Sequence, residues 1–175
     1  EIVMNFCSNE NIPNFAEQQS KGRRCIAFAH KIGSDINTLS DFIWDGYVAI
    51  EDPVRSNVPD AIQAARNAGI KVKIVTGDNP ETAASIAAQA NISQTPNTML
   101  GKEVETQTDT NLRKVDVFAR TKPEDKQTLV KRFQSMGEVV AVTGDGTNDS
   151  AALNQAEVGV AMNNGTDIAK NAADV

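Results

Sequence analysis

From Tyr47 onward, short apolar segments alternate with amphipathic segments of helical length, and this alternation limits the chain to few folds. Residues 139–142 (Val-Val-Ala-Val) form an uninterrupted apolar run, so we expect a strand that is central in its sheet and buried on both faces. Residues 123–136 place their apolar side chains on one stripe of a helix. Strands that alternate with such helices form a parallel sheet with helices packed on its faces. The sequence therefore predicts an α/β fold.

The other expected elements follow the same alternation, and residues 93–110 are polar enough to be a loop with at most a short helix. The first stretch, to Asp45, is irregular and polar, which favours a separate small lobe. We therefore expect two parts, residues 1–45 and residues 46–175. Further strands are predicted at 25–29, 47–50, 70–75, 115–119 and 158–161, and further helices at 59–68, 81–90, near Leu153, and from about Thr166.

Charge and cysteine content exclude several classes of function. The formal net charge of −6 argues against a nucleic-acid partner, because phosphate backbones are bound by surplus Lys and Arg. Cys7 and Cys25 lie far apart in the sequence, and His30 is the single histidine, so we do not expect a zinc site. Two separated cysteines are consistent with a reducing compartment, which we expect for this chain. No apolar run of about 18 residues and no signal peptide occur, so the chain is predicted to be soluble. It begins without Met and reads as part of something longer.

Two Thr-Gly-Asp segments each follow a predicted strand, at Thr76–Asp78 and at Thr143–Asp145. In open α/β sheets, ligands bind outside the carboxyl ends of the strands, so the two segments should converge on one site. Glycine lets the backbone approach an anion closely, a following helix offers free N–H groups, and aspartate supplies a hard oxygen ligand. This combination suits a phosphate group with magnesium.

Asp145 and Asp149 bracket a Gly-Thr-Asn loop that includes Asn148, and such a loop can supply the carboxylates that Mg²⁺ prefers. The alternative is that these carboxylates only cap the next helix. Lys126 lies in the first turn of its predicted helix, where it can neutralise phosphoryl charge; taken alone, such a lysine is usually a solvated surface group. Arg120 follows a strand on the ligand-bearing edge of the sheet.

Three of these segments resemble the second, third and fourth motifs of the haloacid dehalogenase superfamily, in the same order and spacing. They are Thr76-Gly-Asp78, Lys126 within Lys-Pro-Glu-Asp-Lys, and residues 143–149. More narrowly, VTGDN, FAR-x-x-P-x-DK, AVTGDGTNDS and GVAM-x-x-GTD-x-AK resemble the phosphorylation domain of P-type ATPases over nearly all of residues 47–175. Residues 52–55 (Asp-Pro-Val-Arg) and the stretch before them resemble the tail of the nucleotide-binding domain of these pumps. The residues of these motifs are most similar to those of calcium pumps.

The resemblance implies a Rossmann-like, three-layer fold and a cation pump driven by ATP with Mg²⁺, whose intact form is a membrane protein with this part on the cytoplasmic face. Calcium is the implied cation, with sodium, potassium, protons and magnesium still open. The alternatives are a soluble phosphatase of the same superfamily, or a phosphate- or nucleotide-binding module without enzymatic activity. The implied roles are catalysis for Thr76, Gly77, Asp78, Lys126, Asn148 and Asp149, nucleotide contact for Arg24, Arg120, Thr76, Gly77 and Asp78, and magnesium binding for Asp145 and Asp149.

The phosphoryl acceptor of that family is the aspartate of a DKTGT motif, and no Asp-Lys-Thr occurs in this sequence. We therefore expect no ATPase activity from this chain alone. In the family's sheet, the strand that carries this motif lies between the strands expected here at 70–75 and 139–142. Those two edges should pair directly, be bridged by the N-terminal stretch, or cause self-association, since an unpaired apolar edge invites it.

Overall fold

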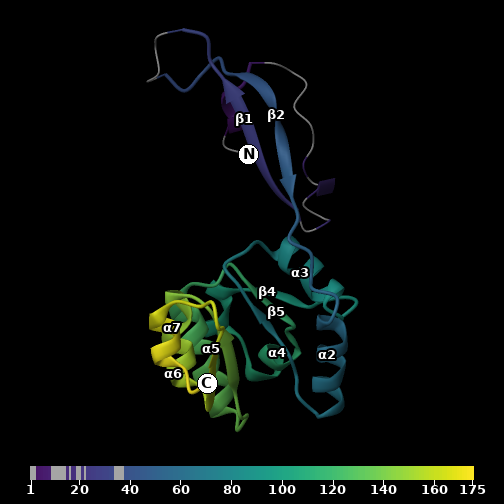
Figure 1. Cartoon of the computed structure of the whole chain (residues 1–175), viewed down its shortest axis with the longest axis vertical. Coiled ribbons are helices and arrows are strands. Elements are labelled where there is room, and N and C mark those ends of the chain that lie inside the picture. Colours follow the sequence, from purple (N-terminus) through teal and green to yellow (C-terminus); the bar gives the residue numbers. More distant parts are fainter. Residues whose placement is uncertain (1–2, 9–14, 16, 19–20, 22, 34–37) are drawn as a thin grey trace. The chain divides into compact units, whose positions relative to one another are not determined.

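The structure is a computed structural model that describes residues 3–8, 15, 17–18, 21, 23–33 and 38–175 (Figure 1). The chain divides into two compact units, residues 1–55 and 56–175. This division lies later in the chain than the expected boundary at Asp45, which falls inside the strand β2 (Ile43–Ile50). The prediction that residues 47–50 begin the parallel sheet is wrong, because β2 pairs antiparallel with β1 (Arg24–His30) in the N-terminal unit.

In the N-terminal unit, the β1–β2 pair follows from alternating side chains. Cross-strand partners include Ile26 with Val48, and the register shifts at a bulge between Phe28 and Ala29. The ring of Phe15 packs edge-on against Tyr47, with ring centroids 4.9 Å apart. The short 3-10 helix η1 (Val3–Phe6) precedes this hairpin. The strand predicted at residues 25–29 is thus confirmed as part of β1.

The strands of the C-terminal unit are all parallel and belong to two small sheets. One sheet has the order β3-β5-β4, from β3 (Ile74–Val75), β4 (Thr98–Leu100) and β5 (Val117–Ala119). The other pairs β6 (Ala141–Gly144) with β7 (Val158–Ala161). These parallel sheets with helices confirm the predicted α/β, Rossmann-like class. β4 lies inside the stretch that was expected to be a loop.

The helices begin and end at the residues that favour such boundaries. Asn79 caps α3 by accepting a hydrogen bond from the Thr82 N–H at 2.8 Å. Gly69 and Gly137 follow α2 and α5 with φ of 82° and 81°, the left-handed conformation that terminates helices. The helices are α2 (Val58–Asn67), α3 (Pro80–Gln89), α4 (Asp109–Lys114), α5 (Pro123–Ser135), α6 (Ser150–Gln155) and α7 (Asp167–Ala172), with the 3-10 helices η2 (Gly101–Thr106) and η3 (Thr147–Asp149).

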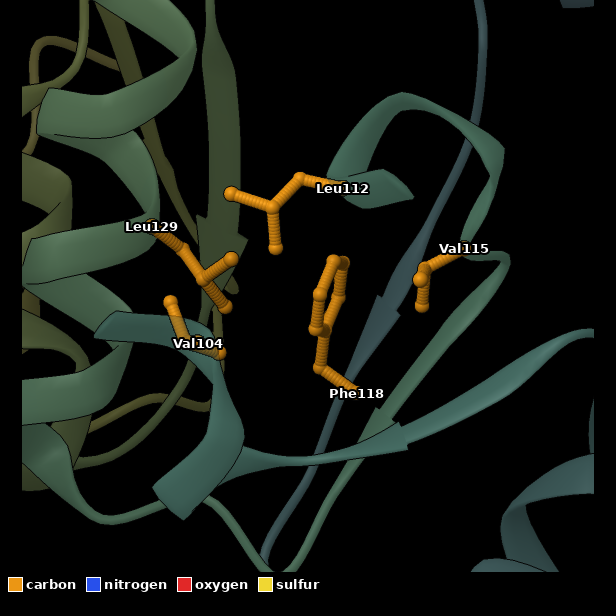
Figure 2. Packing of buried hydrophobic residues seen from close by; sticks show 5 residues of the cluster. All are labelled: Val104, Leu112, Val115, Phe118 and Leu129. Atoms are coloured by element: carbon orange, nitrogen blue, oxygen red, sulfur yellow. The ribbon is translucent and has the colours of Figure 1, made fainter. Parts of the chain in front are cut away.

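The core of the C-terminal unit surrounds β5, whose three residues are all fully buried because hydrophobic clusters cover both of its faces. Figure 2 shows side chains from η2, α4, β5 and α5 converging around the ring of Phe118. Phe118 also meets the Phe133 ring of α5 edge-on, with centroids 6.4 Å apart. This cluster consists of Val104, Leu112, Val115, Phe118 and Leu129. It packs the middle of α5 against β5, η2 and α4.

Among the described residues, no strand pairs with the outer edge of β3 or with the free edge of β6. Between them lies a cavity of about 1020 Å³, lined mainly by residues 69–75, residues 138–143 and the inward face of α5. The prediction that residues 139–142 are central and buried on both faces is wrong. Val139, which precedes β6, is 83% exposed, and the side of β6 that faces away from β7 has no neighbouring strand in the described chain.

Candidate functional site

The loop after β3 is held by its own side chain and by the loop after β5. The Thr76 hydroxyl accepts a hydrogen bond from the Asp78 N–H at 3.1 Å, which closes a tight turn around Gly77. The Thr76 N–H donates to the Phe118 carbonyl of β5 at 2.9 Å, so the loop continues the parallel ladder beyond the last strand residue. Thr76, Gly77 and Asp78 therefore lie together at the carboxyl end of β3, as the sequence predicted.

Arg120 connects this loop to the start of α5. Its N–H donates to the Asp78 carbonyl at 2.9 Å, and the next N–H, of Thr121, donates to the Thr76 carbonyl at 3.0 Å. Arg120 has a φ of 51°, a left-handed conformation that is uncommon outside glycine and that persists only when the surroundings enforce it. The two hydrogen bonds from the Arg120 and Thr121 N–H groups hold the backbone in this conformation. The Arg120 side chain is exposed at the same edge of the sheet.

Lys126 lies in the first turn of α5 and forms an ion pair with Asp149, with the ammonium nitrogen 2.7 Å from one carboxylate oxygen. The two side chains are only 18% and 15% exposed. The other Asp149 oxygen accepts the Gly146 N–H at 3.2 Å. A Cβ at Gly144 would lie 2.5 Å from the Asp149 Cβ, so only glycine permits Asp149 to fold back over the end of β6. Asp149 thus links Lys126 to the loop after β6.

Asp145 follows β6 directly, and its side chain is exposed. Its carbonyl accepts the Thr166 N–H at 2.8 Å, from the loop between β7 and α7. No cluster of three or more potential metal-ligating side chains occurs within the described residues. Mg²⁺ does not require one, since it commonly takes one or two carboxylates, several waters and phosphate oxygens. The exposed Asp145 carboxylate fits that requirement, whereas both Asp149 oxygens already accept hydrogen bonds from the protein.

The cavity between β3 and β6 reaches the carboxyl ends of both strands, where Val75, Lys126, Thr143 and Asp149 line it. Toward the other ends of the strands, Lys73 lies over the Phe133 ring, with its nitrogen 5.5 Å from the centroid. It donates to the backbone carbonyls of Arg113 and Val115. Burial lowers the pKa of the Lys73 ammonium below its ordinary value, against an opposing effect of Asp116.

The structure brings most of the predicted residues to one edge of the C-terminal unit. The Arg120 N–H donates a hydrogen bond to the Thr76–Asp78 loop, and Lys126 forms an ion pair with Asp149. Asn148 is exposed in η3 beside Asp149. Arg24 belongs to β1 in the N-terminal unit.

Sequence reasoning missed two residues that shape this edge, Gly101 and Asp125. Asp125 accepts the Lys122 N–H at 2.8 Å and so caps the helix that carries Lys126. A Cβ at Gly101 would lie 2.6 Å from an Asp125 carboxylate oxygen. Asp125 was detectable as an acidic residue in a first helical turn, but nothing in the sequence marks Gly101.

Comparison with known proteins gives two kinds of match. Residues 11–157 match the family of haloacid dehalogenase-like hydrolases. The chain is 40% identical over 172 residues to Calcium-transporting ATPase 1 of Yarrowia lipolytica, covering 91% of this chain and 18% of that protein. It is 43% identical over 145 residues to Calcium-transporting ATPase 2 of Schizosaccharomyces pombe, covering 79% and 11%. For Calcium-transporting ATPase 1 of Bacillus cereus the identity is 38% over 186 positions, covering 100% and 21%.

The chain therefore spans about a fifth or less of the length of these three relatives. Within the described residues, no helix is long and apolar enough to cross a lipid bilayer.

Proposed function

Because this chain belongs to the haloacid dehalogenase-like hydrolase family, we propose that it is the phosphoryl-handling part of an ATP-driven P-type cation pump. The observation that carries the proposal is the Lys126–Asp149 ion pair, which lines the cavity between β3 and β6, together with the Thr76–Asp78 loop at the carboxyl end of β3. A fixed cation and a tight glycine turn at the carboxyl ends of parallel strands suit a phosphoryl group. The identity to calcium-transporting ATPases supports the pump over a soluble phosphatase.

Each residue at this edge has a distinct proposed role. Lys126 offsets the negative charge that spreads over the phosphoryl oxygens during transfer. Thr76 and Gly77 orient the group through the closely approaching backbone, with Asp78 completing the turn. Asp149 holds the Lys126 ammonium in place, a geometry that favours positioning over metal binding. Asn148 extends the polar surface of the same loop.

Asp145 is the residue that we assign to Mg²⁺, because its carboxylate is exposed directly after β6. When bound, the ion neutralises charge on the phosphoryl oxygens and on the leaving group. Asp145 contributes a single carboxylate from a backbone held by the Thr166 N–H.

ATP is the proposed phosphoryl donor, with Arg120 and Arg24 in contact with the nucleotide. Arg120 is supported by its exposed guanidinium at the site edge and by its enforced left-handed backbone, a feature that clusters at functional sites. Arg24 rests on the resemblance of the N-terminal unit, residues 1–55, to the tail of a nucleotide-binding domain. The C-terminal unit is the proposed phosphorylation domain.

The phosphoryl acceptor is proposed to reach the site on a strand that occupies the cavity between β3 and β6. In parallel ladders, alternate residues face opposite neighbours. The N–H groups of Ile74 and Thr76 bond to β5, so those of Lys73 and Val75 face the cavity. An inserted strand would pair with this row on one side and with β6 on the other. Its carboxyl end would then lie beside Lys126.

In the intact pump, the γ-phosphoryl of ATP passes to the acceptor aspartate and then to water. Each state favours a different conformation of the membrane part, which moves the cation. The chain alone has no Asp-Lys-Thr acceptor, so we propose that it is inactive. Calcium is the proposed cation, and the cytoplasmic face of a membrane is the proposed location.

The open edges of β3 and β6 also support self-association of the chain. Light scattering tests this over a range of concentrations: the mass should rise above that of a single chain, and a strict monomer at high concentration would exclude it. The cation is tested by uptake of labelled calcium into vesicles that contain the full-length protein. Uptake that depends on ATP and is lost in Lys126→Ala supports calcium, and phosphorylation without uptake argues for another cation.

A further inference from the structure

The loop between β7 and α7, residues 162–166, closes over the residue that follows β6. The Met162 N–H donates to the Gly144 carbonyl at 3.0 Å, and the Thr166 N–H donates to the Asp145 carbonyl at 2.8 Å. Within the loop, the Gly165 N–H donates back to the Met162 carbonyl at 2.8 Å. The β6–β7 ladder ends with the pair Gly144–Ala161, so these bonds extend the pairing to Asp145 itself.

Gly165 lies so close to Met162 and Asp145 that a side chain at this position would crowd their backbone atoms. A Cβ at Gly165 would lie 3.0 Å from the Asp145 carbonyl oxygen and 3.2 Å from its Cα. It would also lie 2.9 Å from the Met162 carbonyl oxygen. All three are backbone atoms, so no flexible side chain can move aside. The φ of Gly165 lies outside the left-handed region, so space and not backbone conformation requires glycine here.

Asp145 lies between two glycines that are held by other bonds, because Gly144 ends the β6–β7 ladder and the Gly146 N–H donates to Asp149. The Asp145 side chain is exposed, so packing does not fix it. The contacts that reach the Asp145 carbonyl itself are the Thr166 hydrogen bond and the close approach of Gly165.

We propose that Gly165 and Thr166 are positioning residues for the Asp145 carboxylate, and that they set the affinity of this site for a divalent cation. The inference rests on the proposed assignment of Asp145 to Mg²⁺. Neither residue contacts the ion. They act through the Asp145 backbone. This role also explains the Gly-Thr-Asp segment after β7, residues 165–167, to which the proposed phosphate chemistry assigns no role.

The first test is Mn²⁺ binding to this chain, measured by the electron paramagnetic resonance of free Mn²⁺, which like Mg²⁺ prefers oxygen ligands. We expect the wild-type chain to bind and Asp145→Asn to lose that binding. Gly165→Ala should weaken binding by about tenfold or more, the usual effect of losing support behind a metal ligand.

Gly159→Ala is the matched control for Gly165→Ala. A Cβ at Gly159 would lie 2.6 Å from the Leu153 carbonyl oxygen and 3.3 Å from the Ala173 Cα, so it meets backbone atoms without touching Asp145. This variant should lose stability and keep the wild-type Mn²⁺ affinity in its folded fraction. A purely structural role of Gly165 would make the two variants behave alike.

A second pair of variants removes the hydrogen bond without adding a side chain at position 165. Thr166 has a φ of −66°, which suits proline, so Thr166→Pro replaces the N–H donor with little backbone strain at that residue. Thr166→Ala keeps the N–H and loses only the hydroxyl that caps α7 through the Ala169 N–H. We expect Thr166→Pro to weaken Mn²⁺ binding by about tenfold and Thr166→Ala to leave it unchanged.

The outcomes separate this inference from the proposed function. If Asp145→Asn loses binding while Gly165→Ala and Thr166→Pro match their controls, the positioning role is refuted and the Asp145 assignment stands. If the wild-type chain does not bind Mn²⁺, or if Asp145→Asn binds as tightly as wild type, the Asp145 assignment fails and the positioning role fails with it.

Discussion

Two valines that look alike in sequence should respond oppositely to the same substitution. Val117 lies in the strand predicted at residues 115–119, and Val139 lies in the apolar run at residues 139–142 that predicts a buried strand. Val117 is fully buried between β3 and β4 and packs with Ala83 and Ala87 of α3, whereas Val139 is 83% exposed at the cavity between β3 and β6. The pair therefore tests whether β6 borders an open cavity.

The expected magnitudes follow from this burial. Val→Ala removes two methyl groups, worth about 1.6 kcal/mol of transfer free energy when buried, and the residual cavity raises the cost to about 2–3 kcal/mol. Val117→Ala should lower the free energy of unfolding by that amount. Val139→Ala should change it by less than about 0.5 kcal/mol, as is usual for exposed positions.

Urea unfolding followed by circular dichroism measures both variants, because α2–α7 all lie in the C-terminal unit. Fluorescence of Trp44, the single tryptophan, follows the N-terminal unit separately and should be the same in both variants. Equal losses in the two variants would refute an open cavity beside residues 138–143.

Two further predictions concern pH and packing. The Val140 N–H, which donates to the Glu157 carboxylate, lowers the pKa of that carboxyl in the folded chain. The unfolded chain therefore binds the proton more readily. The stability that this hydrogen bond contributes is present above about pH 4.3 and is lost as the pH falls. Urea unfolding between about pH 5 and 3 should therefore show a smaller loss of stability in Glu157→Gln than in wild type; equal slopes would contradict this. Gly101→Ala should cost about 1–3 kcal/mol, because its Cβ would meet Asp125 and backbone atoms. Gly77→Ala, whose nearest contact is 3.7 Å away, should unfold at nearly the wild-type urea concentration, and similar losses in both would refute the packing argument.

The sequence predicts where the candidate site residues lie better than it predicts how the strands pair. Thr76–Asp78 and Asp145 are recognisable because glycine and aspartate directly after an apolar strand have few other uses. The partnership of Lys126 with Asp149 is not predictable in this way, since it depends on how α5 lies against the loop after β6. The sequence pattern places Lys126 in a helix start and leaves its partner undetermined.

The errors in the predicted strands have a common cause, which is that pairing is a tertiary property. Residues 47–50 alternate like any strand, and only their pairing with β1 assigns them to the N-terminal unit. Residues 139–142 are apolar enough for a buried strand, yet their exposure depends on whether a neighbour is present. β4 spans only Thr98–Leu100, which is too short to show a periodicity.

The most direct test of the pump assignment is phosphorylation by radiolabelled ATP with Mg²⁺, in this chain alone and in the full-length protein. We expect no label and no phosphate release with the chain alone. The full-length protein should carry label on an aspartate as an acyl phosphate that hydroxylamine cleaves, and Lys126→Ala should lose it. Steady phosphate release by the isolated chain that Asp145→Ala abolishes would contradict its proposed inactivity, and a full-length protein that takes no label would contradict the pump assignment.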